Sequence, residues 1–279
     1  MLQSLLSLLP NLRDLAFSEV TLGWAALSEP EDWLAFRPVR LDSLSMLNIM
    51  TVSQTPLEIV ASLCLFSSIK VLHIEMFVNV EDFEGHYDDP HAQPTHPLLL
   101  STDNPYFPSK LRVSSIEVPN PSHVPFFLAL IAKTASVEAI TDVDVARDTN
   151  EQIRALGSFL RVVGPRIKKI TADIVALSYF TISAPTTVQK VILDIRIGGI
   201  TRSWRDQDGS DYISVSTASE FTHFQSAIKQ REGVRKLCIR WYHMPQEKPE
   251  AKLLKRMDSL VRRQLLELDA KGILSFEHI

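Results

Sequence analysis

The stretch from Pro56 to Met76 is the sequence feature that most constrains the fold of this chain. Apolar residues recur at three- and four-residue steps from Ile59 to Phe66, which places them on one face of a helix. After a short break at Ser67–Ser68, the apolar residues between Ile69 and Ile74 follow a strand-like spacing. Neither half can bury its apolar side alone, so the pattern predicts a helix–turn–strand unit that stacks on similar units.

The strand half of this unit follows the pattern Φ-x-x-Φ-x-Φ, where Φ is an apolar residue and places are numbered from one. Segments with this pattern recur along the whole chain, at steps of about 28 residues where no insertion intervenes. Three Φ places carry a residue that is not apolar, namely Ser114, Asp142 and His278. The predicted strands start at Leu12, Leu41, Ile69, Leu111, Val137, Ile167, Val188, Val234 and Ile273.

Three longer intervals interrupt the repeat and predict loop insertions. Residues 78–110 contain five acidic residues followed by five prolines, a composition that resists packing and predicts an exposed, partly disordered loop. Residues 198–216 form a second such interval, and residues 244–251 form a third. We therefore expect a single irregular repeat domain over residues 1–279 with loops at these three places.

The strand motifs resemble leucine-rich repeats, in which a strand and a helix return every 20–29 residues. The segments Leu12–Phe17, Leu41–Met46, Ile69–Ile74 and Val234–Ile239 carry the resemblance. The chain is most similar in character to the irregular repeat region of F-box proteins of the type expanded in basidiomycete fungi. This resemblance implies an α/β solenoid with a parallel, curved sheet and helices on its outer face.

The chain departs from that family in two respects. An F-box should precede the repeats as a helical segment, but Met1 already lies in repeat-like sequence, so we expect a fragment of a longer protein. The asparagine that often follows the last Φ by three residues is also missing, which makes a regular horseshoe doubtful. The residues at those places are Val20, Ile49, Phe77, Pro119, Val145, Val175, Arg196 and Tyr242.

The composition of the sequence limits the kinds of partner and the cellular compartment that we expect. The net charge of −4 and the absence of a long Lys/Arg block argue against nucleic acid as a main partner. Val124–Ala132 is the longest apolar run, and it is too short to span a membrane. Cys64 and Cys238 each lie in an apolar run, so we expect buried free thiols in a reducing compartment, the cytoplasm or the nucleus.

Standard catalytic and cofactor motifs are missing from the sequence, so we expect no cofactor and no catalytic residue. The acidic loop could collect a divalent metal, but its histidines and acids lack a scaffold to fix their geometry, so we expect a solvated loop. The segment Asp206–Asp211 resembles a calcium loop, but its glycine is misplaced and Thr217 stands where the bidentate acid is needed. The loop residues considered for the divalent metal are His86, Asp88, Asp89, His91 and His96.

The best candidate for a functional surface is the sheet face that carries places three, five and seven. A groove of mixed charge suits a protein partner with alternating charges, although any one of these side chains could simply be solvated. Trp204, beside two arginines, could anchor a partner or pack against the body of the protein. The residues predicted to line the face are His73, Glu75, Glu117, Lys169, Thr171, Asp173, Lys190, Asp194, Lys236 and Arg240.

These observations favour a non-enzymatic protein-interaction scaffold, and the resemblance implies the substrate-recognition part of an F-box ubiquitin-ligase receptor. The expected partner is an unknown protein target, with no nucleic acid and no membrane. The ligase adaptor would bind only if an upstream F-box is missing from this chain. Two alternatives remain open: an α/β enzyme of unrecognised type, and a truncated gene product without selected function.

Overall fold

A computed structural model describes most of the repeat core of the chain. The described residues are 2–22, 37–51, 56–75, 100–101, 104, 106–120, 123–145, 150–173, 188–196, 225–226, 228, 233–242 and 251–278. They divide into two compact units, Met1–Val163 and Gly164–Ile279. The expectation of a single domain stays a prediction.

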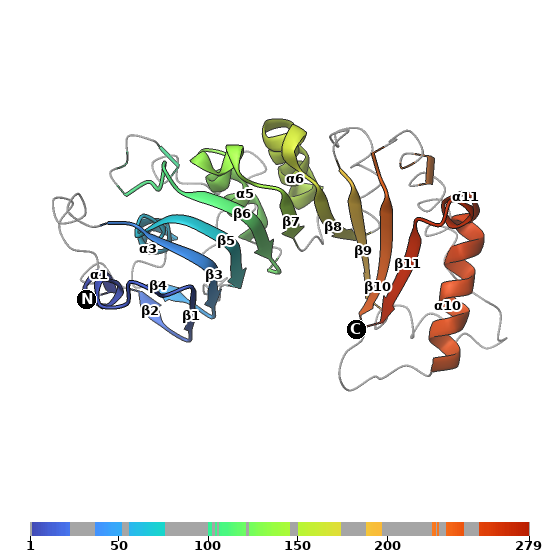
Figure 1. Ribbon diagram of the computed structural model, residues 1–279, viewed down its shortest axis with the longest axis horizontal. Coiled ribbons are helices and arrows are strands. Elements are labelled where there is room, and N and C mark those ends of the chain that lie inside the picture. Colours follow the sequence, from blue (N-terminus) through green and yellow to red (C-terminus); the bar gives the residue numbers. More distant parts are fainter. Residues whose placement is uncertain are drawn as a thin grey trace. The chain divides into compact units, whose positions relative to one another are not determined.

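The first unit is a parallel sheet with helices (Figure 1). Its strands lie in the order in which they follow one another along the chain: β1 (Asp14–Ser18), β3 (Val39–Leu47), β5 (Phe66–Glu75), β6 (Arg112–Val118) and β7 (Asp142–Val145). Each strand is parallel to the next. A small separate pair joins β2 (Thr21–Leu22) to β4 (Met50–Thr51).

Short helices connect the strands of this unit. They are α1 (Leu2–Ser7), α3 (Leu57–Leu63), α5 (Val124–Ile131), the 3-10 turn η3 (Ala135–Glu138) and α6 (Asn150–Val163). The predicted helix–turn–strand unit is present, but α3 ends at Leu63 and β5 already begins at Phe66, earlier than expected. The long apolar run from Val124 forms α5, which is buried along most of its length and packs beside α6.

The second unit repeats this arrangement. Its strands β8 (Lys169–Asp173), β9 (Lys190–Arg196), β10 (Lys236–Tyr242) and β11 (Leu274–His278) are parallel and again follow the order of the sequence. Its helical segments are η4 (Gly164–Arg166), α10 (Ala251–Gln264) and α11 (Leu266–Ala270). The expectation of an α/β fold with a parallel sheet is therefore confirmed in both units.

The strand pattern has a physical cause in the hydrogen bonding at the start of the strands. The amides of Gln189 and Lys190 both donate to the carbonyl of Lys168, and those of Arg235 and Lys236 both donate to Gln189. Two successive residues thus oppose one, as in a β-bulge, and the alternation of side chains loses one step. For this reason places one and four both face the core although they are three residues apart.

The apolar places form the core of the sheet in both units. Leu41, Leu44 and Met46 on β3 are at most 3 % exposed, and Ile69, Leu72 and Ile74 on β5 at most 1 %. In the second unit, Val188 just before β9 and Val191 on β9 are equally buried, as are Leu237 and Ile239 on β10. Helix α10 buries Met257 and Val261, Leu265 is buried just after it, and Asp258 of that helix accepts a hydrogen bond from Trp241 of β10.

Three predicted strand starts are wrong, and they belong to the three strands that broke the pattern. Strand pairing aligns Ile116 with Leu72, so place one of β6 is Val113 rather than Leu111. The pairing of Val143 with Ile116 moves place one of β7 from Val137 to Ile140. Place four of β11 is Leu274, which pairs with Leu237, rather than Phe276.

The corrected register removes all three non-apolar residues from the core places. In β6 and β7 the core places become Val113, Ile116, Val118, Ile140, Val143 and Val145, which are at most 1 % exposed. The observed register buries three apolar side chains per strand, and the alternative buries two. The observed register is therefore more stable, because each additional buried apolar side chain contributes about 1.5–3 kcal/mol of stability.

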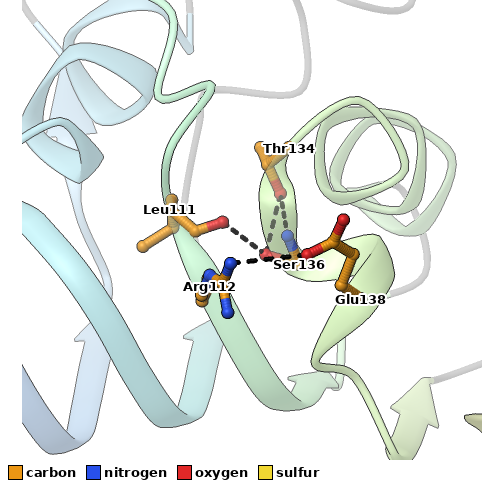
Figure 2. A network of polar contacts seen from close by, with 5 residues as sticks. All are labelled: Leu111, Arg112, Thr134, Ser136 and Glu138. Atoms are coloured by element: carbon orange, nitrogen blue, oxygen red, sulfur yellow. Dashed lines mark hydrogen bonds and ion pairs between the residues drawn. The ribbon is translucent and has the colours of Figure 1, made fainter.

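A buried serine side chain, rather than the backbone of the strand expected at Val137, makes the hydrogen bonds to the start of β6. Figure 2 shows Ser136, from η3, beside the start of β6. Its hydroxyl donates to the carbonyl of Leu111 over 3.0 Å and accepts from the amide of Val113 over 2.9 Å. Thr134 caps η3 by accepting from the amide of Ser136. A side chain thus replaces one step of the sheet and holds η3 against β6.

Two predicted loops fall largely outside the described residues. Residues 198–216 lie outside them entirely, as do Trp204 and the considered metal and calcium segments, and of the interval 244–251 only Ala251, the first residue of α10, is described. Of the interval 78–110, only the last part is described, and there Leu100 and Phe107 are 5 % and 6 % exposed. The end of this interval therefore packs against the body of the unit, contrary to the expectation of an exposed loop.

Candidate functional site

The sheet face opposite the buried apolar places brings the predicted residues into rows across the strands. In the first unit, place five carries Ser45 on β3, His73 on β5, Glu117 on β6 and Asp144 on β7. Glu117 was expected at place seven, and the corrected register places it directly beside His73. Neighbouring parallel strands lie about 4.8 Å apart, so these side chains are immediate neighbours.

His73 is the centre of this row. Its Nδ1 lies 3.1 Å from a carboxylate oxygen of Glu117, and its Nε2 lies 3.9 Å from one of Glu75. The hydrogen bond to Glu117 raises the pKa of His73 above its ordinary value of 6.5, against an opposing effect of partial burial. The charges of Glu117, Glu75 and Asp144 raise the pKa further. The imidazole thus takes up a proton more readily than a solvated histidine.

Asp144 belongs to this cluster and was missed by sequence reasoning. It was missed because β7 was expected to start at Val137, which places Asp144 outside the predicted rows. The triplet Ile140, Val143 and Val145 fits the apolar pattern without exception, and that signal was available in the sequence.

The row from Ser45 through His73 to Glu117 has the residue types of a catalytic triad but not its geometry. A triad needs the serine hydroxyl within hydrogen-bond reach of the histidine nitrogen that does not face the acid. No hydrogen bond between Ser45 and His73 occurs among the described residues, and Nε2 faces Glu75 instead. The arrangement therefore provides a charged surface but no activated nucleophile.

The second unit carries charged rows on either side of a buried one. At place three, Lys169, Lys190 and Lys236 lie side by side on β8, β9 and β10. At place seven, Asp173, Asp194 and Arg240 are aligned on the same strands, and Glu277 follows on β11. All six predicted charged residues of this unit are therefore brought together in two rows.

The middle row of the second unit differs from the expected polar stripe. Thr171 was predicted to line the binding face, but it is 0 % exposed. It aligns with Ile192, which is 3 % exposed, and Ile192 aligns with the buried Cys238. The charged rows on either side, whose lysine and arginine stems can cover apolar surface, are what this face offers to a partner.

Neither cysteine is poised for chemistry. The Cys64 thiol donates a hydrogen bond to the carbonyl of Tyr106 over 3.1 Å, and burial raises the pKa of Cys64 to about 12. Burial also raises the pKa of Cys238, and the neighbouring Glu277 adds to that effect. A thiol with a raised pKa holds little of the nucleophilic thiolate at neutral pH.

Metal binding and membrane insertion find no support in the part of the chain that the structure describes. No group of three or more His, Cys, Asp or Glu side chains there has an arrangement that could hold a metal ion. None of the described helices is long and apolar enough to cross a membrane.

Comparison with known proteins leaves the residues as the source of any functional argument. No family model matches the chain, and no curated protein shows significant similarity to it.

Proposed function

We propose that this chain is a non-enzymatic protein-interaction scaffold, built as an irregular leucine-rich-repeat-like solenoid. The observation that carries the proposal is the sequence-order stacking of parallel strands within each unit. Such stacking makes each place of the strand motif into a row across the sheet, and it is how repeat proteins build extended binding surfaces. The proposed binding surface is the sheet face with the rows at places three and seven, together with the place-five row of the first unit, because the place-five row of the second unit is buried.

The chemistry of that face supports binding rather than catalysis. It carries many charged side chains that are at least partly exposed, including His73, Glu75 and Glu117 in the first unit and three lysines in the second. Charged rows of this kind improve the specificity and the rate of association with a protein of complementary charge. A triad-type mechanism would instead need a serine hydroxyl bonded to His73, and the described residues of this row show no such bond.

The resemblance to F-box proteins gives the proposal a cellular role. In those proteins an F-box recruits the adaptor of a ubiquitin ligase, and the repeats hold the target. We propose the second of these roles for the sheet face described above. An F-box in a longer form of the protein would supply the first.

Site-specific photo-crosslinking in cells tests the proposal. A photoreactive amino acid replaces Ser45 or Ser115 on the sheet face in two variants. In matched control variants it replaces Lys255 or Ser259 on α10, which are exposed and lie on the helical side of the second unit. We expect one protein to be crosslinked from both sheet positions and from neither helix position.

Two outcomes of this crosslinking experiment would contradict the proposal. Crosslinks to the same proteins from all four positions would show nonspecific contact, and crosslinks from α10 alone would place the binding surface on the other side. Either outcome would overturn the assignment of the sheet face.

A further inference from the structure

The amino ends of the strands in the second unit form a strongly basic edge. It comprises the residues at places two and three of β8, β9 and β10 apart from Gln189, and we call it the basic edge: Lys168, Lys169, Lys190, Arg235 and Lys236. Lys168, Arg235 and Lys236 are exposed, and Lys169 and Lys190 are half-buried. No acidic residue occurs in the three segments 167–169, 188–190 and 234–236 that build it.

The bulges at the starts of β9 and β10 explain why two successive places of these strands contribute to this edge. Because successive amides share one acceptor there, the residues at places two and three both avoid the core. The stacking of strands then multiplies the effect, since Lys190 pairs in register with both Lys169 and Lys236. Sequence neighbours and strand neighbours together concentrate the positive charge.

The first unit shows that the same edge can be built with its charges balanced. There, place two carries Arg13, Asp42 and Lys70 on successive strands. The carboxylate of Asp42 lies 3.4 Å from the Arg13 guanidinium and 2.5 Å from the Lys70 ammonium. The fold thus allows alternating charge at this edge, whereas place two of the second unit carries Lys168, Gln189 and Arg235, with no acidic residue between the cations.

An edge of like charges has an energetic cost in the free protein. Charges on neighbouring strands are about 5 Å apart, within the screening length of about 8 Å at physiological ionic strength. Like charges directly opposite each other in a sheet are destabilising. Among the described residues, the three lysines at place three have no ion-pair partner to offset this repulsion. An anionic ligand would remove it on binding.

We infer that the basic edge binds an acidic segment of the partner protein, an inference that rests on the proposed scaffold function. Place seven of the same strands, about 13 Å further along, carries Asp173, Asp194 and Arg240, two acids among three residues, so a continuous polyphosphate that reached this row would meet net negative charge. A protein segment avoids that repulsion, because its carboxylates can be confined to the basic edge. Glutamate or aspartate side chains between neighbouring lysines make the recognition contacts.

Fluorescence anisotropy with a fluorescein-labelled glutamate octapeptide tests this inference on the full chain. The test variant is Lys169→Gln, Lys190→Gln and Lys236→Gln combined. We expect it to bind the peptide about tenfold more weakly, since each exposed ion pair contributes about 0.2–1 kcal/mol. We also expect a smaller loss of affinity between 50 and 200 mM salt than in the unmodified chain, as fewer charges take part.

A matched control separates the edge from net charge. The combination Lys110→Gln, Arg154→Gln and Lys255→Gln removes the same number of positive charges from exposed places elsewhere. We expect its affinity for the octapeptide to stay within twofold of the unmodified chain. Circular dichroism of each variant verifies that the fold is retained.

Three outcomes would overturn the inference. The first is no binding of the octapeptide, the second is equal loss in the test and control variants, and the third is tighter lysine-dependent binding of a thymidine dodecamer or of phosphatidylserine vesicles. None of these touches the proposed function itself, because a partner crosslinked from Ser45 and Ser115 could bind through the first unit alone.

Discussion

Substitution of Ser136 by alanine should destabilise the first unit through two groups that lie on another segment. The hydroxyl of Ser136 accepts from the amide of Val113 and donates to the carbonyl of Leu111, and these residues are 0 % and 1 % exposed. A buried polar group left without a partner costs about 1–3 kcal/mol. With two such groups, we expect Ser136→Ala to lower the free energy of unfolding by about 2–6 kcal/mol.

Urea denaturation followed by circular dichroism measures this change, with the transition midpoint and slope reported for each protein. Ser62→Ala is a matched control, because Ser62 is equally buried at 1 % exposure and its hydroxyl donates to Ile59 within α3. That carbonyl already has a helical partner, so its loss should cost less than about 1 kcal/mol.

Amide hydrogen exchange supplies a local readout that a general loss of packing would not give. In Ser136→Ala we expect the amide of Val113 to exchange faster relative to that of Leu72, which is bonded within the sheet. The reasoning would be refuted if Ser136→Ala and Ser62→Ala were equally stable. Unchanged exchange at Val113 would also contradict it.

Three further perturbations test individual environments. The interaction with Glu117 raises the pKa of His73, so its contribution to stability should be complete below about pH 6.5 and should be lost as the pH rises through the raised pKa. Urea titrations across that pH range should show this dependence in the unmodified chain and not in His73→Gln. Thr171→Val should stabilise the second unit by about 1 kcal/mol, because the buried hydroxyl has no hydrogen-bond partner in the described structure; thermal unfolding that shows a loss instead would reveal an essential partner. In Cys238→Ser, the remaining thiol of Cys64 should resist alkylation at pH 8 until urea unfolds the chain, since its pKa is about 12; rapid labelling of the native protein, seen by mass spectrometry, would disagree.

Several features of the protein follow from the sequence alone. The helical spacing in Leu57–Leu63 and the strand spacing after Phe66 identify both element types, because each apolar periodicity matches only one backbone geometry. The same spacing places Lys169, Lys190 and Lys236 at equivalent positions of their strands. Their alignment across the sheet needed only the parallel pairing that the repeat pattern predicts.

The register of β6, β7 and β11 was decided by the tertiary structure. Two overlapping apolar patterns compete near Leu111, and the one that starts at Val113 buries three apolar side chains instead of two. The spacing of apolar residues within the segment does not distinguish the two registers, because the number of side chains that each register buries depends on the neighbouring strands and on η3. The proximity of His73 to Glu117 and Asp144 depends entirely on that choice.

The apolar pattern of the sequence also did not predict which residues on the sheet face are buried. Thr171 occupies an outward place by alternation, yet no part of its hydroxyl is accessible. Alternation determines on which side of a strand a residue lies, whereas burial depends on what packs over that side. Sequence therefore determined the elements and the composition of the rows, and tertiary packing determined which strands came into register and which rows face solvent.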